Sequence, residues 1–202
     1  MPAEAPSVAA PFESNSAKAS GSAVTPPSTP NAGTAWRPAA ELSVAEANQL
    51  LDAAIPSGAN IERLGSARTV NDAALFEHPT WSPPVKPDTH VIDFSTAKNE
   101  QFVRVYAQGS DSGQVGSWVM RADDIAGLTR EQIASKYSLP QPPDWVTDVT
   151  VPSGTRIQAS VANNILLGKN AGGGGGVQFQ ILNVPESPAE FSQWFSNARK
   201  LR

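Results

Sequence analysis

From residue 89 to residue 182 the chain contains a series of short segments that are rich in β-branched and aromatic residues, and in some of them apolar and polar residues alternate; this β pattern restricts the fold more than any other feature. Successive side chains of a strand point to opposite faces, so the alternation predicts a sheet with a buried face. Turn-forming residues separate the segments. We expect about six strands, at residues 90–94, 102–107, 117–120, 146–151, 155–159 and 177–182.

Three helices are predicted by their start signals. Ser43 and Thr129 each open a capping box, in which a Glu or Gln three residues later binds back to the first residue. Ser187 precedes Pro188, and apolar residues then follow at helical spacing as far as Ala198, so we expect a closing helix that docks on the sheet. Helices and strands together predict an α+β fold with a small twisted sheet, mixed or antiparallel, and flanking helices.

The sequence divides into three parts. Residues 1–35 are rich in Pro, Ser and Ala and contain only three charged residues, so we expect a disordered leader. Residues 36–88 contain the first helix and then a Pro-rich stretch, which we expect to be irregular apart from a short helix at 69–76. Residues 89–202 are expected to form the α+β domain.

Composition excludes several kinds of site. The chain of 202 residues has no cysteine, so disulfide bonds, thiolate metal sites and a cysteine nucleophile are excluded. Its two histidines, His78 and His90, are too few and too isolated for a zinc site, and we predict no metal. The net charge of −4 argues against non-specific binding to DNA or to an anionic membrane, because such binding requires a basic surface.

The sequence also bears on where the protein acts. No apolar run approaches the roughly 20 residues that cross a bilayer, so no membrane span is expected. No basic start followed by an apolar segment is present at the N-terminus, so a cleavable signal peptide is not predicted. We expect the protein either to stay in the cytoplasm or to be secreted or injected into a target cell by a machine that does not use such a peptide.

Two candidates for chemistry lie within the expected strands. Arg104 is the only charge in its strand segment, and alternation puts it on the same strand face as Tyr106. An Arg in this place either makes a structural pair or points its donors at a phosphate. Ser117 and Trp118 follow Gly116 at the start of another strand, where the Trp ring is either core or a surface on which nicotinamide or adenine stacks.

A third candidate is the run of glycines from Gly172 to Gly176, which leads directly into a strand. Such a run is either a flexible hairpin connection or a loop whose backbone N–H groups bind an anion. It is not a P-loop, because no Gly-Lys-Ser/Thr follows the glycines. Beyond the run, Gln178 and Gln180 share one strand face, and amides on a face that is expected to be buried need hydrogen-bond partners.

These features, in their order along the chain, resemble a known set. The resemblance is to the C-terminal domains of bacterial polymorphic toxins, and it is greatest to NAD glycohydrolases of the tuberculosis necrotizing toxin type. It covers roughly residues 100–183 and rests on Arg104, Gly116-Ser117-Trp118, Leu139-Pro140, a Val-Pro-x-Gly segment at 151–154, and Gly174-Gly175-Gly176-Val177-Gln178.

The resemblance implies a toxin-like domain at 89–202 of a secreted toxin or effector, with NAD as the substrate that is cleaved between nicotinamide and ribose. Arg104 and Gln178 would be catalytic, with Arg104 on the diphosphate. The resemblance would assign the other NAD contacts to Tyr106, Ser117, Trp118, Gly174, Gly175, Gly176 and Gln180. Trp118 stands where the family has Tyr, and the family's His between the Leu-Pro segment and the glycines is missing.

Three alternatives stay open. ADP-ribosyl transfer is a looser resemblance, in which Gln178 or Gln180 would replace the catalytic Glu. A ribonuclease toxin would bring Arg104, Arg156, Lys169 and His90 to a phosphate, against the acidic charge of the chain. A non-enzymatic effector would bind a host protein through its sheet. Beside NAD, the expected partner is a cognate immunity protein or a host protein.

Overall fold

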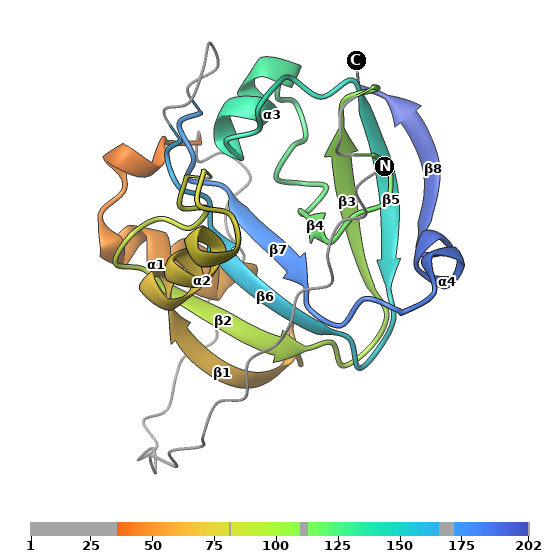
Figure 1. Cartoon of the computed structure of the whole chain (residues 1–202), viewed down its shortest axis with the longest axis horizontal. Coiled ribbons are helices and arrows are strands. Elements are labelled where there is room, and N and C mark those ends of the chain that lie inside the picture. The colour runs from red at the N-terminus through yellow and green to blue at the C-terminus, as the bar shows by residue number, and fades with distance from the viewer. Residues whose placement is uncertain (1–35, 81, 110–112, 166–171, 202) are drawn as a thin grey trace. The chain divides into compact units, whose positions relative to one another are not determined.

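The computed structural model describes residues 36–80, 82–109, 113–165 and 172–201, and the expected leader lies outside them. Within these residues the fold is α+β, as predicted, with two antiparallel sheets (Figure 1). The helices are α1 (Val44–Ala54), α2 (Ala67–Glu77), α3 (Arg130–Lys136) and α4 (Pro188–Ser192), with a 3₁₀ turn η1 (Ala39–Glu41). The strands are β1 (Asn60–Ser66), β2 (His90–Ser95), β3 (Glu100–Tyr106), β4 (Trp118–Val119), β5 (Trp145–Val151), β6 (Arg156–Val161), β7 (Val177–Ile181) and β8 (Phe195–Lys200).

The strands form two sheets, whereas the sequence predicted one. The larger sheet has the order β1-β2-β6-β7-β4, and the smaller has the order β3-β5-β8. β4 joins them: it pairs with β7, and Met120, the residue that follows it, bridges to Val103 of β3. Figure 1 shows β4 between β7 and β3 accordingly. All six predicted strands are present, with boundaries shifted by at most two residues.

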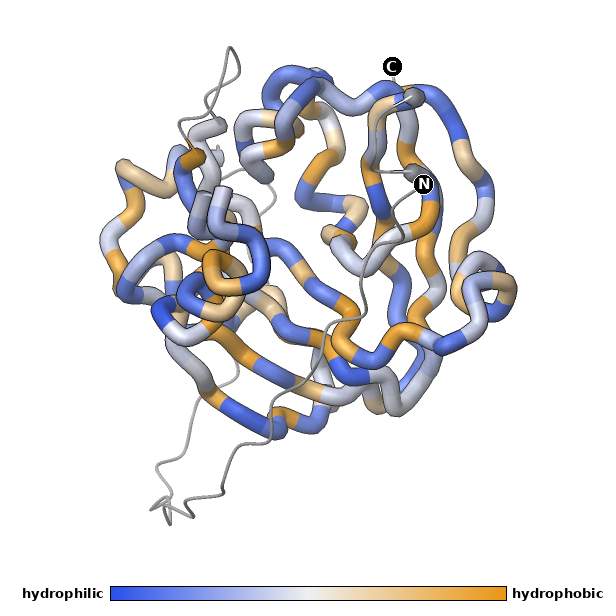
Figure 2. The backbone as a smooth tube through the Cα atoms, viewed as in Figure 1, coloured by the Kyte–Doolittle hydropathy of each residue, from blue (hydrophilic) through white to orange (hydrophobic). Residues whose placement is uncertain are grey.

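The larger sheet has an apolar face and an opposite face that is polar along β6 and β7. The apolar face, here called the inner face, carries Phe179 and packs on Leu51 of α1 and on Phe102 of β3. The Phe102 and Phe179 rings lie 5.0 Å apart between centroids. The opposite face, here called the outer face, carries Gln158 and Gln180. This alternation is visible along β6 and β7 in Figure 2 and confirms the period-two pattern of the sequence.

Residues 36–88 are an integral part of the fold, since they belong to the same compact unit as the strands that follow. α1 covers the inner face, and β1 pairs with β2 at the edge of the larger sheet. α2 packs on the outer face, where Ala67 and Val85 enclose Val91. The segment from 61 to 66, which we expected to be irregular, is therefore a strand.

The helix starts are confirmed by their hydrogen bonds. In α1, Glu46 N donates to Ser43 Oγ at 3.2 Å, and Ser43 N donates to the Glu46 carboxylate at 2.8 Å. This backbone bond, helped by the Arg37 guanidinium, lowers the pKa of Glu46 to about 2. Thr129 caps α3 in the same reciprocal way, and the Ser187 side chain accepts a bond at the start of α4.

The expected closing helix is wrong. α4 ends at Ser192, and the chain then enters β8, which pairs with β5. Phe191 and Phe195 are both buried, and their rings are 5.2 Å apart between centroids. The apolar spacing that looks helical therefore arises from one helical turn followed by the first residue of a strand. An edge strand such as β8, with five of its six residues exposed, shows no alternation in sequence.

Tyr137, which follows α3, has the only buried side-chain polar atom that lacks a hydrogen-bond partner among the described residues. Its ring lies in a second apolar cluster with Val103, Met120 and Val146. Burial, and secondarily the charge of Asp124, raises the pKa of the phenol well above its ordinary value. A hydroxyl in such a place costs stability.

The replacement Tyr137→Phe is therefore expected to leave the free energy of unfolding at pH 7 unchanged or to raise it by about 1 kcal/mol. In the unfolded chain the phenol ionises near pH 10, whereas the folded phenol stays protonated. Stability is thus lost as the pH rises above about 10, and the variant lacks this part of the loss. Urea unfolding of both proteins at pH 7 and pH 10.5 measures the difference; an equal alkaline loss in both would contradict it.

Candidate functional site

A straight row of side chains crosses the outer face from one edge of the larger sheet to the other. The strand register pairs Arg63 with Asp93, Asp93 with Gln158, Gln158 with Gln180, and Gln180 with Trp118. Directly paired residues of antiparallel strands project on the same side. The row therefore brings together two predicted residues, Gln180 and Trp118, with three that the sequence did not single out.

Gln178 lies next to this row on the same face, as predicted, opposite Ser160 of β6. Its Nε2 donates to Pro84 O at 3.2 Å and to Ser160 Oγ at 3.4 Å. Gln158 Nε2 donates to Asp93 Oδ1 at 2.9 Å. Gln180 makes no side-chain hydrogen bond within the described part of the chain. These glutamines, together with Trp118, are half-buried, so their outer ends reach solvent.

Arg104 has a structural position. The residue is 7% exposed, and its guanidinium packs against the backbone of Gly116. Nε donates to Gly113 O at 3.0 Å, and Nη1 donates to Trp118 O at 3.0 Å. Arg104 therefore anchors the segment between β3 and β4. It also fixes the backbone of Trp118, whose ring lies on the outer face. Ser117 is part of the same segment, and its carbonyl accepts from Ile181 N at 2.9 Å.

The two predicted catalytic residues are not brought together. Phe102, which shares its strand face with Arg104, contacts Phe179 on the inner face. Gln178 projects on the opposite side of β7 from Phe179. Arg104 thus approaches β4 from the inner side, while Gln178 lies on the outer face. The resemblance assigns Arg104 to the diphosphate of NAD. For Arg104 and Gln178 to bind the same NAD molecule, that molecule would have to reach both sides of β7.

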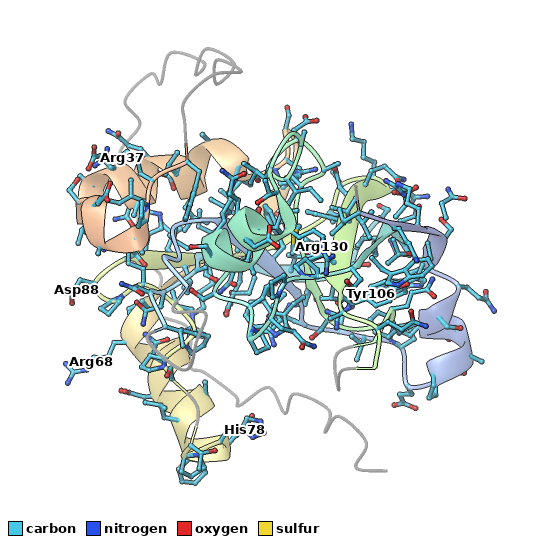
Figure 3. The ribbon with its side chains drawn as sticks, turned by 90° about the horizontal axis from the view of Figure 1, so that it is seen from above. Arg37, Arg68, His78, Asp88, Tyr106 and Arg130 are labelled. Carbon is cyan, nitrogen blue, oxygen red and sulfur yellow. The ribbon has the colours of Figure 1, made fainter. Side chains whose placement is uncertain are left out.

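Tyr106 is also separate from the row. It lies at the end of β3 in the smaller sheet and stacks on Trp145 of β5, with ring centroids 6.4 Å apart and an interplanar angle of 16°. Figure 3 shows it well away from Arg68 of α2 and from His78, the residue that follows this helix. Tyr106 shares a strand face with Arg104, as predicted, but no observed contact links it to the glutamines.

The glycine run does not form an anion nest. Each of its backbone N–H groups already donates within the chain: Gly172 to Ile165 O, Gly173 to Ser135 Oγ, Gly174 to Ser135 O, Gly175 to Ala162 O and Gly176 to Lys136 O. Its carbonyls accept in turn, Gly173 from Ala39 N and Gly174 from the Trp36 indole. The interpretation of Gly174, Gly175 and Gly176 as phosphate donors is therefore corrected: the run is a packed junction of three chain segments.

The residues considered for a ribonuclease do not converge either. Arg156 Nε donates to Glu62 at 2.8 Å at one end of the outer face. His90 Nε2 lies 2.9 Å from Asp52 of α1, on the inner side of the sheet. Lys169 lies outside the described residues.

Sequence reasoning missed Asp93 and Gln158. Asp93 lies between Ile92 and Phe94, and Gln158 lies between Ile157 and Ala159; a polar residue between two apolar residues of a strand is the signal that could have found them. Their pairing depends on the order β2-β6-β7, in which strands distant in sequence become neighbours, and alternation within one strand carries no information about that order.

Comparison with known proteins adds no family. No protein-family model matches the chain, and no match was found among curated proteins or solved structures. Among the described residues no helix combines the length and the apolar character needed to cross a membrane. Nor do three or more His, Asp or Glu side chains of this part of the chain cluster in a way that could hold a metal ion.

Proposed function

We propose that the chain is the NAD-cleaving domain of a secreted bacterial toxin or effector and that the outer face binds the nicotinamide riboside end of NAD. The observation that carries the proposal is the row from Trp118 to Asp93, next to Gln178. It combines an aromatic ring, amides and a carboxylate on one half-buried surface. The choice of NAD as the substrate rests on the family resemblance, and the choice of the outer face as its binding surface rests on the strand register.

The reaction defines what such a surface must do. The bond between C1′ of the ribose and the pyridinium nitrogen breaks, and its electron pair neutralises the nicotinamide. Positive charge develops on the ribose until water adds to C1′ and loses a proton to solvent. Dipoles and charges aimed at that cation lower the barrier. Amide oxygens and the negative charge of Asp93 have the required sign, and Trp118 offers a ring face for stacking.

Arg104 takes a different role in this proposal from the one the family implies. It is a positioning residue, because it donates to the carbonyl of Trp118 and anchors the segment that carries this ring. Gln178 and Gln180 are the residues assigned to the sugar and the leaving group. Transfer of ADP-ribose to an acceptor other than water would use the same surface.

Nicotinamide release from NAD by the full chain tests the proposal. We expect Gln178→Ala and Gln180→Ala each to lower the rate about tenfold to a hundredfold, as the loss of a transition-state contact does. The matched control is Gln101→Ala, which removes a glutamine from β3 in the smaller sheet. No release by the folded wild type, with or without cell lysate as an acceptor source, would refute the function.

Binding to a host protein is the second candidate, and the edge strand β1 favours it. Ile61 and Leu64 of β1 are 54% and 68% exposed, and a sheet edge can pair with an extended segment of another protein. The double variant Ile61→Thr with Leu64→Thr separates the two functions. Lost toxicity with unchanged nicotinamide release would favour binding; parallel loss or retention of both would favour the enzyme.

A further inference from the structure

The amides of Gln158 and Gln178 have a fixed orientation. A carboxylate and a carbonyl can only accept, so Asp93 and Pro84 each require the nitrogen end of the glutamine that they bind. The Oε1 atoms consequently point away from these partners. Within the described part of the chain neither Oε1 accepts a hydrogen bond, and both side chains are half-buried.

The two amides lie close together on the outer face. Gln158 pairs with Gln180, and Ser160, two residues further along β6, pairs with Gln178. Two oxygen acceptors therefore flank the uncommitted amide of Gln180. Asp93 adds negative charge behind Gln158 and is only 6% exposed. The two oxygen acceptors favour groups that donate hydrogen bonds. Arg63 lies opposite Asp93 at the edge of the sheet and is the cation of the row, so the acceptors lie on the side of Asp93 that faces β7.

We propose that Gln158 and Gln178 form an acceptor subsite for the hydroxyl groups of a ribose, and that Asp93 is the positioning residue that orients Gln158. The subsite rests on the proposed function, since it identifies which part of NAD lies on the outer face. Ribose hydroxyls donate to the two carbonyl oxygens, while the attached ring lies toward Trp118, which pairs with Gln180 at the other end. The diphosphate lies off this patch.

The test measures recognition of hydroxyl groups and does not depend on cleavage. Its probes are a carbocyclic nicotinamide riboside, which has no glycosidic bond to cleave, and the 2′,3′-dideoxy form of the same molecule. Calorimetry gives their affinities for the full chain. We expect the wild type to bind the hydroxyl form about tenfold more tightly, a ratio that corresponds to one to two hydrogen bonds. Gln158→Met alone is expected to lower the ratio to about threefold, because Gln178 still accepts a hydroxyl, and Gln158→Met combined with Gln178→Met is expected to bring the ratio close to one.

Variants of Asp93 separate positioning from a general structural effect. Asp93→Leu leaves the nitrogen of Gln158 without its acceptor, and we expect the ratio to fall as far as it does in Gln158→Met. Asp93→Asn keeps an acceptor oxygen for that nitrogen and is expected to leave the ratio close to that of the wild type, about tenfold. The double variant Asp93→Leu with Gln158→Met should discriminate no worse than Gln158→Met alone, because Asp93 acts through Gln158. Gln101→Met in the smaller sheet is the matched control.

The outcomes distinguish this subsite from the proposed function. Discrimination by the wild type that is reduced in Gln158→Met supports the subsite even if no nicotinamide is released from NAD, in which case the enzymatic function alone fails. Nicotinamide release with unaltered discrimination in Gln158→Met overturns the subsite and leaves the function standing. A wild type that binds both forms equally, or neither, also overturns the subsite.

Discussion

Replacing Gly175 with alanine is expected to lower the free energy of unfolding by about 3 kcal/mol, which for a domain of this size corresponds to a melting temperature lower by about 6–12 °C. Gly175 has a φ of +89°, a conformation that costs an L-residue about 1–2 kcal/mol. A Cβ atom would also overlap with the carbonyl oxygen of Arg37, which is backbone and cannot rotate away. Thermal unfolding followed by circular dichroism measures the loss.

A second glycine isolates the steric part of this effect. Gly154 has a similar φ of +81°, but a Cβ atom there would meet nothing within 4 Å. Gly154→Ala should therefore show only the conformational cost, about 1 kcal/mol. Similar losses at Gly175 and Gly154 would mean that segment 36–39 does not pack on the glycine run as the structure describes.

The second large effect is expected at Arg104. Arg104→Met leaves Gly113 O and Trp118 O without their buried charged donor, and we expect a loss of about 3 kcal/mol in the free energy of unfolding. Arg199→Met is the matched control. Arg199 makes an ion pair with Asp148 but its side chain is 52% exposed, so its removal should cost less than about 1 kcal/mol.

The same pair of variants decides between the two roles of Arg104. A positioning residue lowers stability when removed, and nicotinamide release falls because Trp118 is no longer held. A direct contact with the diphosphate would instead weaken the affinity for ADP-ribose while stability stays near that of the wild type. Urea unfolding and calorimetry with ADP-ribose, performed on the same preparations, distinguish these results.

Local signals in the sequence were sufficient for most elements of the fold. The capping boxes at Ser43 and Thr129 depend on contacts three residues apart, and both form. In the larger sheet, β7 alternates between buried and half-buried residues along its whole length. β2 is instead a short run of buried residues, which is typical of a strand covered on both faces. Failures occur at sheet edges: β1 is exposed and contains an irregularity between Ile61 and Arg63, and β8 is exposed along most of its length. Exposed strands need no alternation, so they leave no pattern.

The candidate site was only partly predictable for a related reason. The shared face of Gln178 and Gln180 follows from their spacing in one strand, and the structure has it. The separation of Arg104 from Gln178 depends on two sheets that meet at β4, which no short-range pattern specifies. The glycine run was misinterpreted for another reason. Glycine is required both where two backbone segments pack closely and where a loop binds phosphate, so composition alone does not distinguish the two.

The position of β4 connects the outer face of the larger sheet with the smaller sheet. Trp118 presents its ring to the outer face and its carbonyl to Arg104, and Met120 is bonded to Val103 in both directions, at 2.8 and 2.9 Å. A molecule that stacks on the ring would therefore contact the strand that connects the two sheets. Amide hydrogen exchange at Val103 and Met120 should slow when the outer face is occupied, although these amides lie away from it. Binding at the outer face of the larger sheet would in this way be detected as slower amide exchange in the smaller sheet.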